Sequence, residues 1–118
     1  MDFISSDLNI ENEYPKLVRD RIPEIIKNKG GSPETRILDD GEYLKYLLKK
    51  MIEESTELLY SLEKGNTEEE LADVFELIDA ILKLKDWTKD QIVLVQEEKR
   101  LKNGGFNDRI LLLKKPTS

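Results

Sequence analysis

The chain of 118 residues contains no cysteine and no histidine. Without cysteine there can be no disulfide and no thiolate metal site, and without histidine there can be no imidazole ligand or imidazole acid–base catalyst. Carboxylate, lysine, arginine, tyrosine and hydroxyl groups must therefore carry whatever chemistry this chain performs.

Long hydrophobic runs and an excess of positive charge are also lacking. The longest apolar runs are four residues, at 92–95 and 110–113, and residues 1–15 show no basic segment followed by an apolar stretch. We therefore expect a soluble, cytoplasmic protein. Acidic residues outnumber basic ones by 25 to 19, for a net charge of -6. This balance argues against a nucleic-acid polymer or a membrane as partner, but a small phosphorylated ligand remains compatible through a bridging metal ion.

The length fits one domain, which we place at residues 14–118, after a polar N-terminal arm at residues 1–13. Hydrophobic periodicity and capping residues predict four helices in this domain. The first is short, has Pro23 in its first turn and is stopped by Gly30. The second spans residues 42–64, with an N-cap offered by Asp39 or Asp40 and a stop at Gly65. The third spans residues 68–85, and the fourth runs from an N-cap at Thr88 to a stop at Gly104.

Two short segments have the composition of strands. Residues 34–38 and 109–113 are rich in branched and apolar side chains, and we expect them to pair as a two-stranded accessory that needs helices beneath it. The predicted fold class is therefore mainly α: an antiparallel bundle of about four helices with a small β element.

The predicted third helix, residues 68–85, is apolar over more than half of its circumference. A few short neighbours in the same chain cannot cover so wide a face, and an exposed apolar patch favours association. We therefore expect a homo-oligomer, either a homodimer or a dimer of dimers.

Two acidic clusters lie within the second and third predicted helices. Residues three apart share a helix face, so Glu54 with Glu57, and Glu70 with Asp73, each present two carboxylates on one side. A helical wheel places Glu54 at the edge of the apolar arc and turns Glu53 toward water. Folding the two helices back on each other brings four carboxylates together, and a hard divalent cation such as Mg²⁺ would relieve their repulsion.

A purely structural interpretation competes with this one. Acidic side chains on a helix surface are commonly solvated, and those in a first turn favour the helix dipole. Thr67 and Glu70 also match the Thr-x-x-Glu capping box. Against this interpretation, the wheel places Glu70 inside the apolar arc of its helix and Asp73 on the border, where an unpaired carboxylate costs free energy.

The combined motifs resemble the all-α nucleoside triphosphate pyrophosphohydrolases. This MazG-like superfamily also includes phosphoribosyl-ATP pyrophosphohydrolase and dimeric dUTPases. Its signature, EExxE followed at a variable gap by ExxD, matches this chain in order and type. Three further segments, KLVRDRIPEII, TRILDDGEYLKYLLKK and NGGFNDRILL, look like a MazG-like subgroup. The matching positions are Glu53, Glu54, Glu57, Glu70 and Asp73, and the three segments are residues 16–26, 35–50 and 103–112.

The resemblance implies a Mg²⁺-dependent nucleotide pyrophosphohydrolase, with Mn²⁺ as a substitute ion, that cleaves a nucleoside triphosphate to monophosphate and pyrophosphate. It implies that the metal is bound by four carboxylates, that Glu53 and Glu54 are catalytic, and that site residues can come from a partner chain. Phosphate also needs cations. The metal ligands expected are Glu54, Glu57, Glu70 and Asp73, and the phosphate-binding residues expected are Lys16, Arg19, Arg21 and Arg109.

Two other functions compete with this one. A hydrolase acting on a phosphoribosyl nucleotide would keep the same metal site and differ only in substrate. A non-catalytic helical interaction module would use the wide apolar face of residues 68–85 for a partner protein and retain a vestigial metal site. The sequence leaves the preferred base and sugar open.

Overall fold

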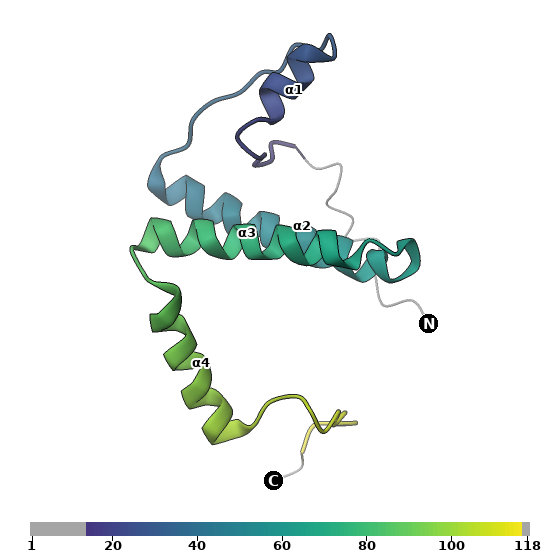
Figure 1. Cartoon of the computed structure of the whole chain (residues 1–118), viewed down its shortest axis with the longest axis vertical. Helices are drawn as coiled ribbons and strands as arrows, with labels where there is room; N and C mark the ends of the chain where they lie inside the picture. The colour runs from purple at the N-terminus through teal and green to yellow at the C-terminus, as the bar shows by residue number, and fades with distance from the viewer. Residues whose placement is uncertain (1–13, 117–118) are drawn as a thin grey trace. The chain divides into compact units, whose positions relative to one another are not determined.

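The computed structural model describes residues 14–116, so the predicted N-terminal arm lies outside the described residues. These residues form two compact units, the first ending at Asp86 and the second beginning at Trp87. The described chain is helical, and Figure 1 labels its elements. The helices are α1 (Ile22–Asn28), α2 (Asp40–Lys64), α3 (Thr67–Lys85) and α4 (Lys89–Asn103).

Helices α2 and α3 form an antiparallel hairpin, which is the principal helix–helix contact of the first unit (Figure 1). The start of α2 is fixed by Asp39, whose carboxylate accepts a hydrogen bond of 2.8 Å from the backbone N–H of Glu42. Its end is fixed by Gly65, which has a φ of 78° in the left-handed region that glycine tolerates best. The predicted N-terminal cap and glycine stop of this helix are confirmed.

The start of α3 differs from the capping-box interpretation. The helix begins at Thr67 itself, and its N-cap residue is Asn66, which makes no side-chain cap. The Thr67 hydroxyl instead lies 3.0 Å from the hydroxyl of Ser61 at the end of α2. The predicted pairing of Thr67 with Glu70 in a capping box is therefore wrong, because the threonine side chain bonds across the hairpin.

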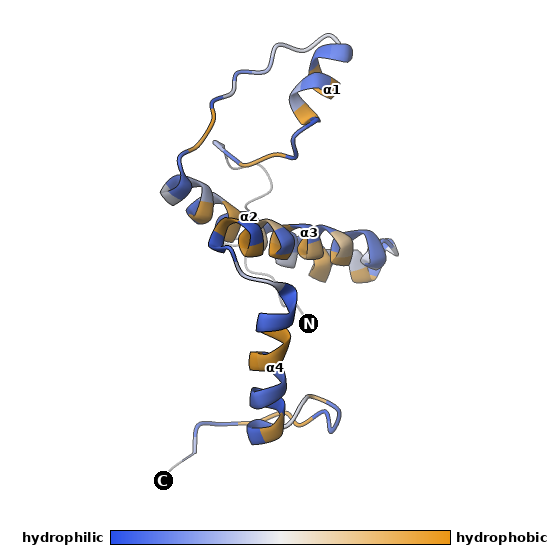
Figure 2. Cartoon of the chain, turned by 60° about the vertical axis from the view of Figure 1, so that its left-hand side comes forward, coloured by the Kyte–Doolittle hydropathy of each residue, from blue (hydrophilic) through white to orange (hydrophobic). Residues whose placement is uncertain are grey.

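Four of the five buried residues of α2 are polar. Leu47, Glu54 and Ser61 are buried and follow each other at intervals of seven residues, which places them on one side of the helix. Leu48 and Ile52, two apolar residues of the same helix, are about half exposed. Hydrophobic residues recur along both helices of the hairpin (Figure 2), and several of them are exposed. No described helix combines the length and apolar character that crossing a membrane requires.

The two shorter helices follow their predicted signals. Pro23 lies in the first turn of α1, although the helix ends at Asn28, two residues before the positive φ of Gly30. In the second unit, Thr88 caps α4 in a complete capping box with Gln91. The cap at Thr88 is confirmed, and its partner Gln91 was not predicted.

Both predicted strands are wrong. Residues 34–38 and 109–113 are described, and neither segment has strand structure. A strand needs hydrogen-bonding neighbours and an apolar layer beneath it, whereas Ile37 is 95% exposed and Leu113 is 86% exposed. Arg109 has a φ of 56°, which breaks the extended backbone. The accessory β element is therefore absent from residues 14–116.

Candidate metal site

Three of the predicted metal ligands come together across the hairpin. Glu54 and Glu57 lie one turn apart on α2, and Glu70 lies in the first turn of α3. One carboxylate oxygen from each of the three lies within 4.8 Å of the others. The i, i+3 spacing on one helix and the tight Gly65 turn between the helices produce this arrangement.

Two oxygens in this cluster are buried without a hydrogen-bond partner. They are Oε2 of Glu54 and Oε2 of Glu70. The other oxygen of Glu70 accepts a bond of 3.3 Å from the side-chain amide of Asn66. Leaving a buried polar atom unpaired is costly, so the two free oxygens require a ligand or a proton.

The same crowding changes the acidity of the α2 carboxyl groups. Burial, followed by the nearby charges and hydrogen bonds of Glu57, Glu70 and Asp73, raises the pKa of Glu54 to about 8. Burial also raises the pKa of Glu57, against an opposing hydrogen bond from Glu54. For both glutamates, burial and neighbouring negative charges disfavour the ionised form of the side chain. A cation between the groups would reverse that preference.

The donor set fits a hard divalent cation. All three donors are carboxylate oxygens, the ligand type that Mg²⁺, Mn²⁺ and Ca²⁺ prefer. Oxygens on opposite sides of one ion lie about 4.2 Å apart around Mg²⁺ and about 5 Å apart around Ca²⁺. The observed separation of up to 4.8 Å is of this size, so the cluster accommodates ions in this range after small side-chain adjustments.

The fourth predicted ligand, Asp73, contacts an arginine. Its Oδ1 accepts a hydrogen bond of 2.5 Å from Nη2 of Arg19, and Nη1 of Arg19 lies 3.8 Å from Glu76. Arg19 thus reaches α3 from the segment before α1, next to the acidic cluster, with its side chain 55% exposed. Asp73 is close enough to raise the pKa of Glu54, but it is not one of the three residues whose oxygens converge.

Glu53 is buried, so its predicted orientation toward water is wrong. The residue is 5% exposed, and its carboxylate accepts a hydrogen bond of 3.1 Å from Nζ of Lys50. The same ammonium group lies 3.7 Å from Glu54. A helical wheel describes an isolated helix, and it omits both the other parts of the chain that cover Glu53 and the lysine one turn earlier.

The other predicted phosphate-binding residues are Lys16, Arg21 and Arg109. Nζ of Lys16 is 4.9 Å from the ring centre of Tyr14, and Arg21 is exposed at the start of α1. Arg109 is exposed and belongs to the second unit. Among the predicted phosphate-binding residues, Arg19 contacts a predicted metal ligand, Asp73.

Lys50 and Asn66 also belong to the site, although neither was predicted as a site residue. Lys50 precedes Glu53 and Glu54 by three and four residues, the spacing at which helix side chains meet. That signal was present in the sequence. The bond from Asn66 to Glu70 depends on the conformation of the hairpin turn and has no comparable sequence signal.

Comparison with known proteins gives one partial similarity. No protein-family model matches the chain, and no solved structure matches it. An uncharacterized protein of Mycolicibacterium smegmatis is 51% identical over 43 residues, which are 36% of this chain and 44% of that protein. The similarity thus spans less than half of the relative's length.

Proposed function

We propose that this protein is a MazG-like, Mg²⁺-dependent nucleotide pyrophosphohydrolase that cleaves a nucleoside triphosphate to a nucleoside monophosphate and pyrophosphate. Its substrate would belong to the cytoplasmic nucleotide pool. The observation that carries the proposal is the convergence of Glu54, Glu57 and Glu70 with two buried, unpartnered oxygens. A carboxylate cluster of this kind is costly unless it binds a cation, and a carboxylate-bound cation is a common means of binding triphosphates.

The residues at this site would have two roles, metal binding and phosphate binding. Glu54, Glu57 and Glu70 would hold the ion, with Asp73 joining them after Arg19 turns toward a substrate phosphate. Bound Mg²⁺ would supply charge stabilisation for the phosphate oxygens. Arg19 suits the phosphate because a guanidinium group forms paired hydrogen bonds with phosphate oxygens, and its side chain is largely exposed.

The reaction is a hydrolysis of a phosphoanhydride. A water oxygen bonds to phosphorus as the anhydride bond breaks, and pyrophosphate leaves. The proton released by the water must pass to a base, and histidine is absent. We assign that role to the carboxylate of Glu53, because it adjoins Glu54 in the sequence and is not one of the three groups that converge on the cation position.

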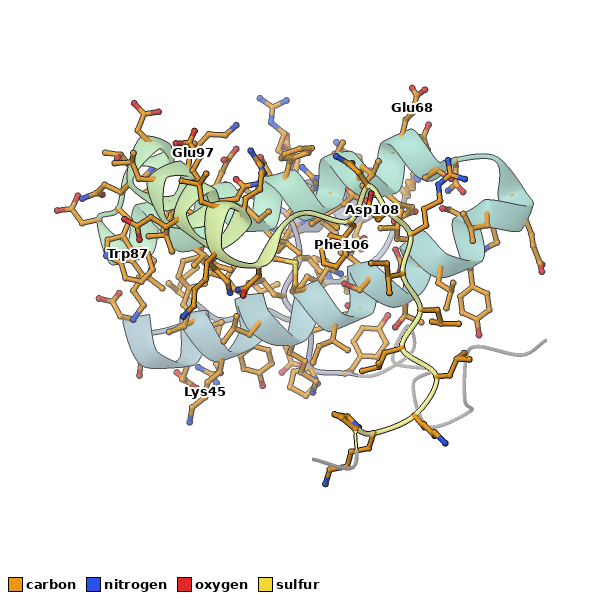
Figure 3. The ribbon with its side chains drawn as sticks, turned by 90° about the horizontal axis from the view of Figure 1, so that it is seen from below. Lys45, Glu68, Trp87, Glu97, Phe106 and Asp108 are labelled. Atoms are coloured by element: carbon orange, nitrogen blue, oxygen red, sulfur yellow. The ribbon has the colours of Figure 1, made fainter. Side chains whose placement is uncertain are left out.

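The test is pyrophosphate release from ribo-, deoxy- and modified nucleoside triphosphates in the presence of Mg²⁺. We expect activity that Glu54→Gln and Asp73→Asn each reduce by at least about 100-fold, since each removes a charged group from the site. Glu68→Gln is the matched control, because Glu68 is exposed and points away from α2 (Figure 3). Release from no triphosphate by a folded protein that binds metal would overturn the proposed substrate and favour a phosphoribosyl nucleotide or an interaction module.

We also propose that the active form is a homodimer or a dimer of dimers in which the helices of two copies complete one bundle. Leu47 and Leu77 are the buried apolar residues among residues 14–116, and so small a core cannot by itself stabilise a domain of this length. Apolar side chains that are at least 38% exposed line both helices of the hairpin. They are Leu48, Ile52, Leu62, Leu71, Phe75 and Ile78. A second copy offers matching apolar helices of the same length and spacing.

A further inference from the structure

Lys50 lies between the two adjacent glutamates of α2 and is largely buried. Its side chain is 19% exposed, while the side chains of Glu53 and Glu54 are 7% and 8% exposed. Nζ of Lys50 is 3.1 Å from Oε2 of Glu53 and 3.7 Å from Oε1 of Glu54. The oxygen of Glu54 that remains unpartnered is the other one, Oε2.

This geometry divides the carboxylate of Glu54 into two edges. One edge faces the lysine ammonium group, and the other edge has no partner. An ion pair along a helix normally lies on the surface and contributes little, but here the carboxylates are buried, where an uncompensated charge is costly. The position of Lys50 therefore affects both the charge and the orientation of the cluster.

We propose that Lys50 is a positioning residue of the metal site: it compensates the charge of Glu53 and one edge of Glu54, and leaves Oε2 of Glu54 for the cation. This inference rests on the proposed metal site. Because Lys50 and the cation act on the same carboxylate, they compete electrostatically. The lysine stabilises the metal-free protein and weakens metal binding.

The test measures Mn²⁺ affinity by calorimetry and metal-free thermal stability in EDTA for the wild type and Lys50→Gln. We expect Lys50→Gln to bind Mn²⁺ roughly 10-fold more tightly, the effect of removing one positive charge about 6 Å from a divalent ion in a medium close to water. We also expect it to melt at a lower temperature without metal, and Mn²⁺ to raise its melting temperature more than that of the wild type.

Two further variants separate this role from general packing. Lys50→Arg keeps the charge, so its Mn²⁺ affinity should stay within about 2-fold of the wild type. Lys45→Gln is the charge-matched control on the same helix, because Lys45 is exposed and points away from α3 (Figure 3), and it should leave affinity and stability unchanged. If Lys50→Gln does not fold without metal, Lys50→Gln combined with Glu53→Gln should restore folding by removing the uncompensated carboxylate.

The outcomes distinguish this inference from the proposed function. Equal or weaker Mn²⁺ binding by Lys50→Gln, with normal binding by the wild type, would overturn the role of Lys50 alone. Failure of the double variant to recover stability would also overturn it. A wild type that binds no Mn²⁺ would overturn the metal site and this inference together.

Discussion

At the scale of single residues, Glu54 combines burial with negative charge. It is 6% exposed, its neighbours Glu57 and Glu70 carry like charge, and one of its oxygens has no partner. Lys50 compensates part of that charge from one side. Without a cation, the favoured response of such a group is to retain its proton at neutral pH.

A dependence of stability on pH follows from the raised pKa of Glu54. In the folded protein this pKa is about 8, compared with an ordinary value of 4.5. A carboxyl group whose pKa rises on folding stabilises the fold below its unfolded pKa, and this contribution is lost as pH rises through the folded value. In EDTA we expect the unfolding free energy to fall by on the order of 1–3 kcal/mol between pH 5 and pH 8.5.

Urea titrations at the two pH values measure this change, and Glu54→Gln is the comparison. The amide does not titrate, so the variant should lose clearly less stability over the same interval. Parallel pH profiles for the wild type and Glu54→Gln would contradict the assignment of the effect to this carboxyl group. Adding Mg²⁺ should flatten the wild-type profile, because the ion takes the place of the proton.

At the scale of the helices, the hairpin turn determines which residues of α2 and α3 meet. Gly65 ends α2 in the left-handed region with a φ of 78°, and a Cβ atom at that position would have no neighbour within 4 Å. Its importance is therefore conformational and does not come from close packing. Asn66 follows at once and donates to Glu70, so the turn also positions one member of the acidic cluster.

Gly65→Ala should destabilise the protein by about 1 kcal/mol, because alanine is strained at this positive φ. The corresponding fall in melting temperature is roughly 4 °C. Gly105→Ala is the control, since Gly105 also has open space around it but lacks a positive φ. Equal stabilities of the two variants would show that the left-handed conformation at Gly65 is unimportant.

The helices could be predicted from the sequence because helical periodicity and capping depend on residues close together in the chain. The helical periodicity and the capping residues Asp39, Gly65 and Thr88 predicted α2, α3 and α4 to within two residues at each end. The strands failed because residues 34–38 and 109–113 depend on non-local pairing that a short apolar run does not guarantee. The helical wheel also correctly predicted that Glu54 faces inward.

Other features of the site depend on packing and could not be obtained from spacing alone. One buried side of α2 carries Leu47, Glu54 and Ser61, whereas the apolar residue Ile52 is 54% exposed. An ideal wheel favours the apolar stripe for burial, but it contains no information about the neighbouring helix or a partner chain. For the same reason it turned Glu53 toward water.

At the scale of the whole molecule, the exposed apolar residues of the hairpin make self-association the expected state. Phe75 is 57% exposed and Ile52 is 54% exposed, while Leu47 and Leu77 are the buried apolar residues of the described chain. An isolated hairpin with so few buried apolar side chains is marginal. A second copy would cover these faces with helices of the same apolar pattern.

Sedimentation velocity should therefore show particles of at least twice the mass of one chain. Ile52→Asp and Phe75→Asp should each shift the protein toward a monomer of lower stability, because each places a charge in the proposed interface. Ile37→Asp is the matched control: Ile37 is 95% exposed and lies outside the hairpin. A monomeric wild type at working concentration would contradict the proposed assembly.

The central claim is that carboxylates from α2 and α3 together bind a divalent cation. Its most direct test is calorimetric titration of Mn²⁺ into the wild type, Glu70→Gln and the exposed control Glu68→Gln at pH 8. We predict saturable binding by the wild type and by Glu68→Gln, and binding at least about 10-fold weaker in Glu70→Gln, which loses a ligand from the second helix. Absence of saturable binding by a folded wild type, or equal affinity in all three proteins, would contradict the site.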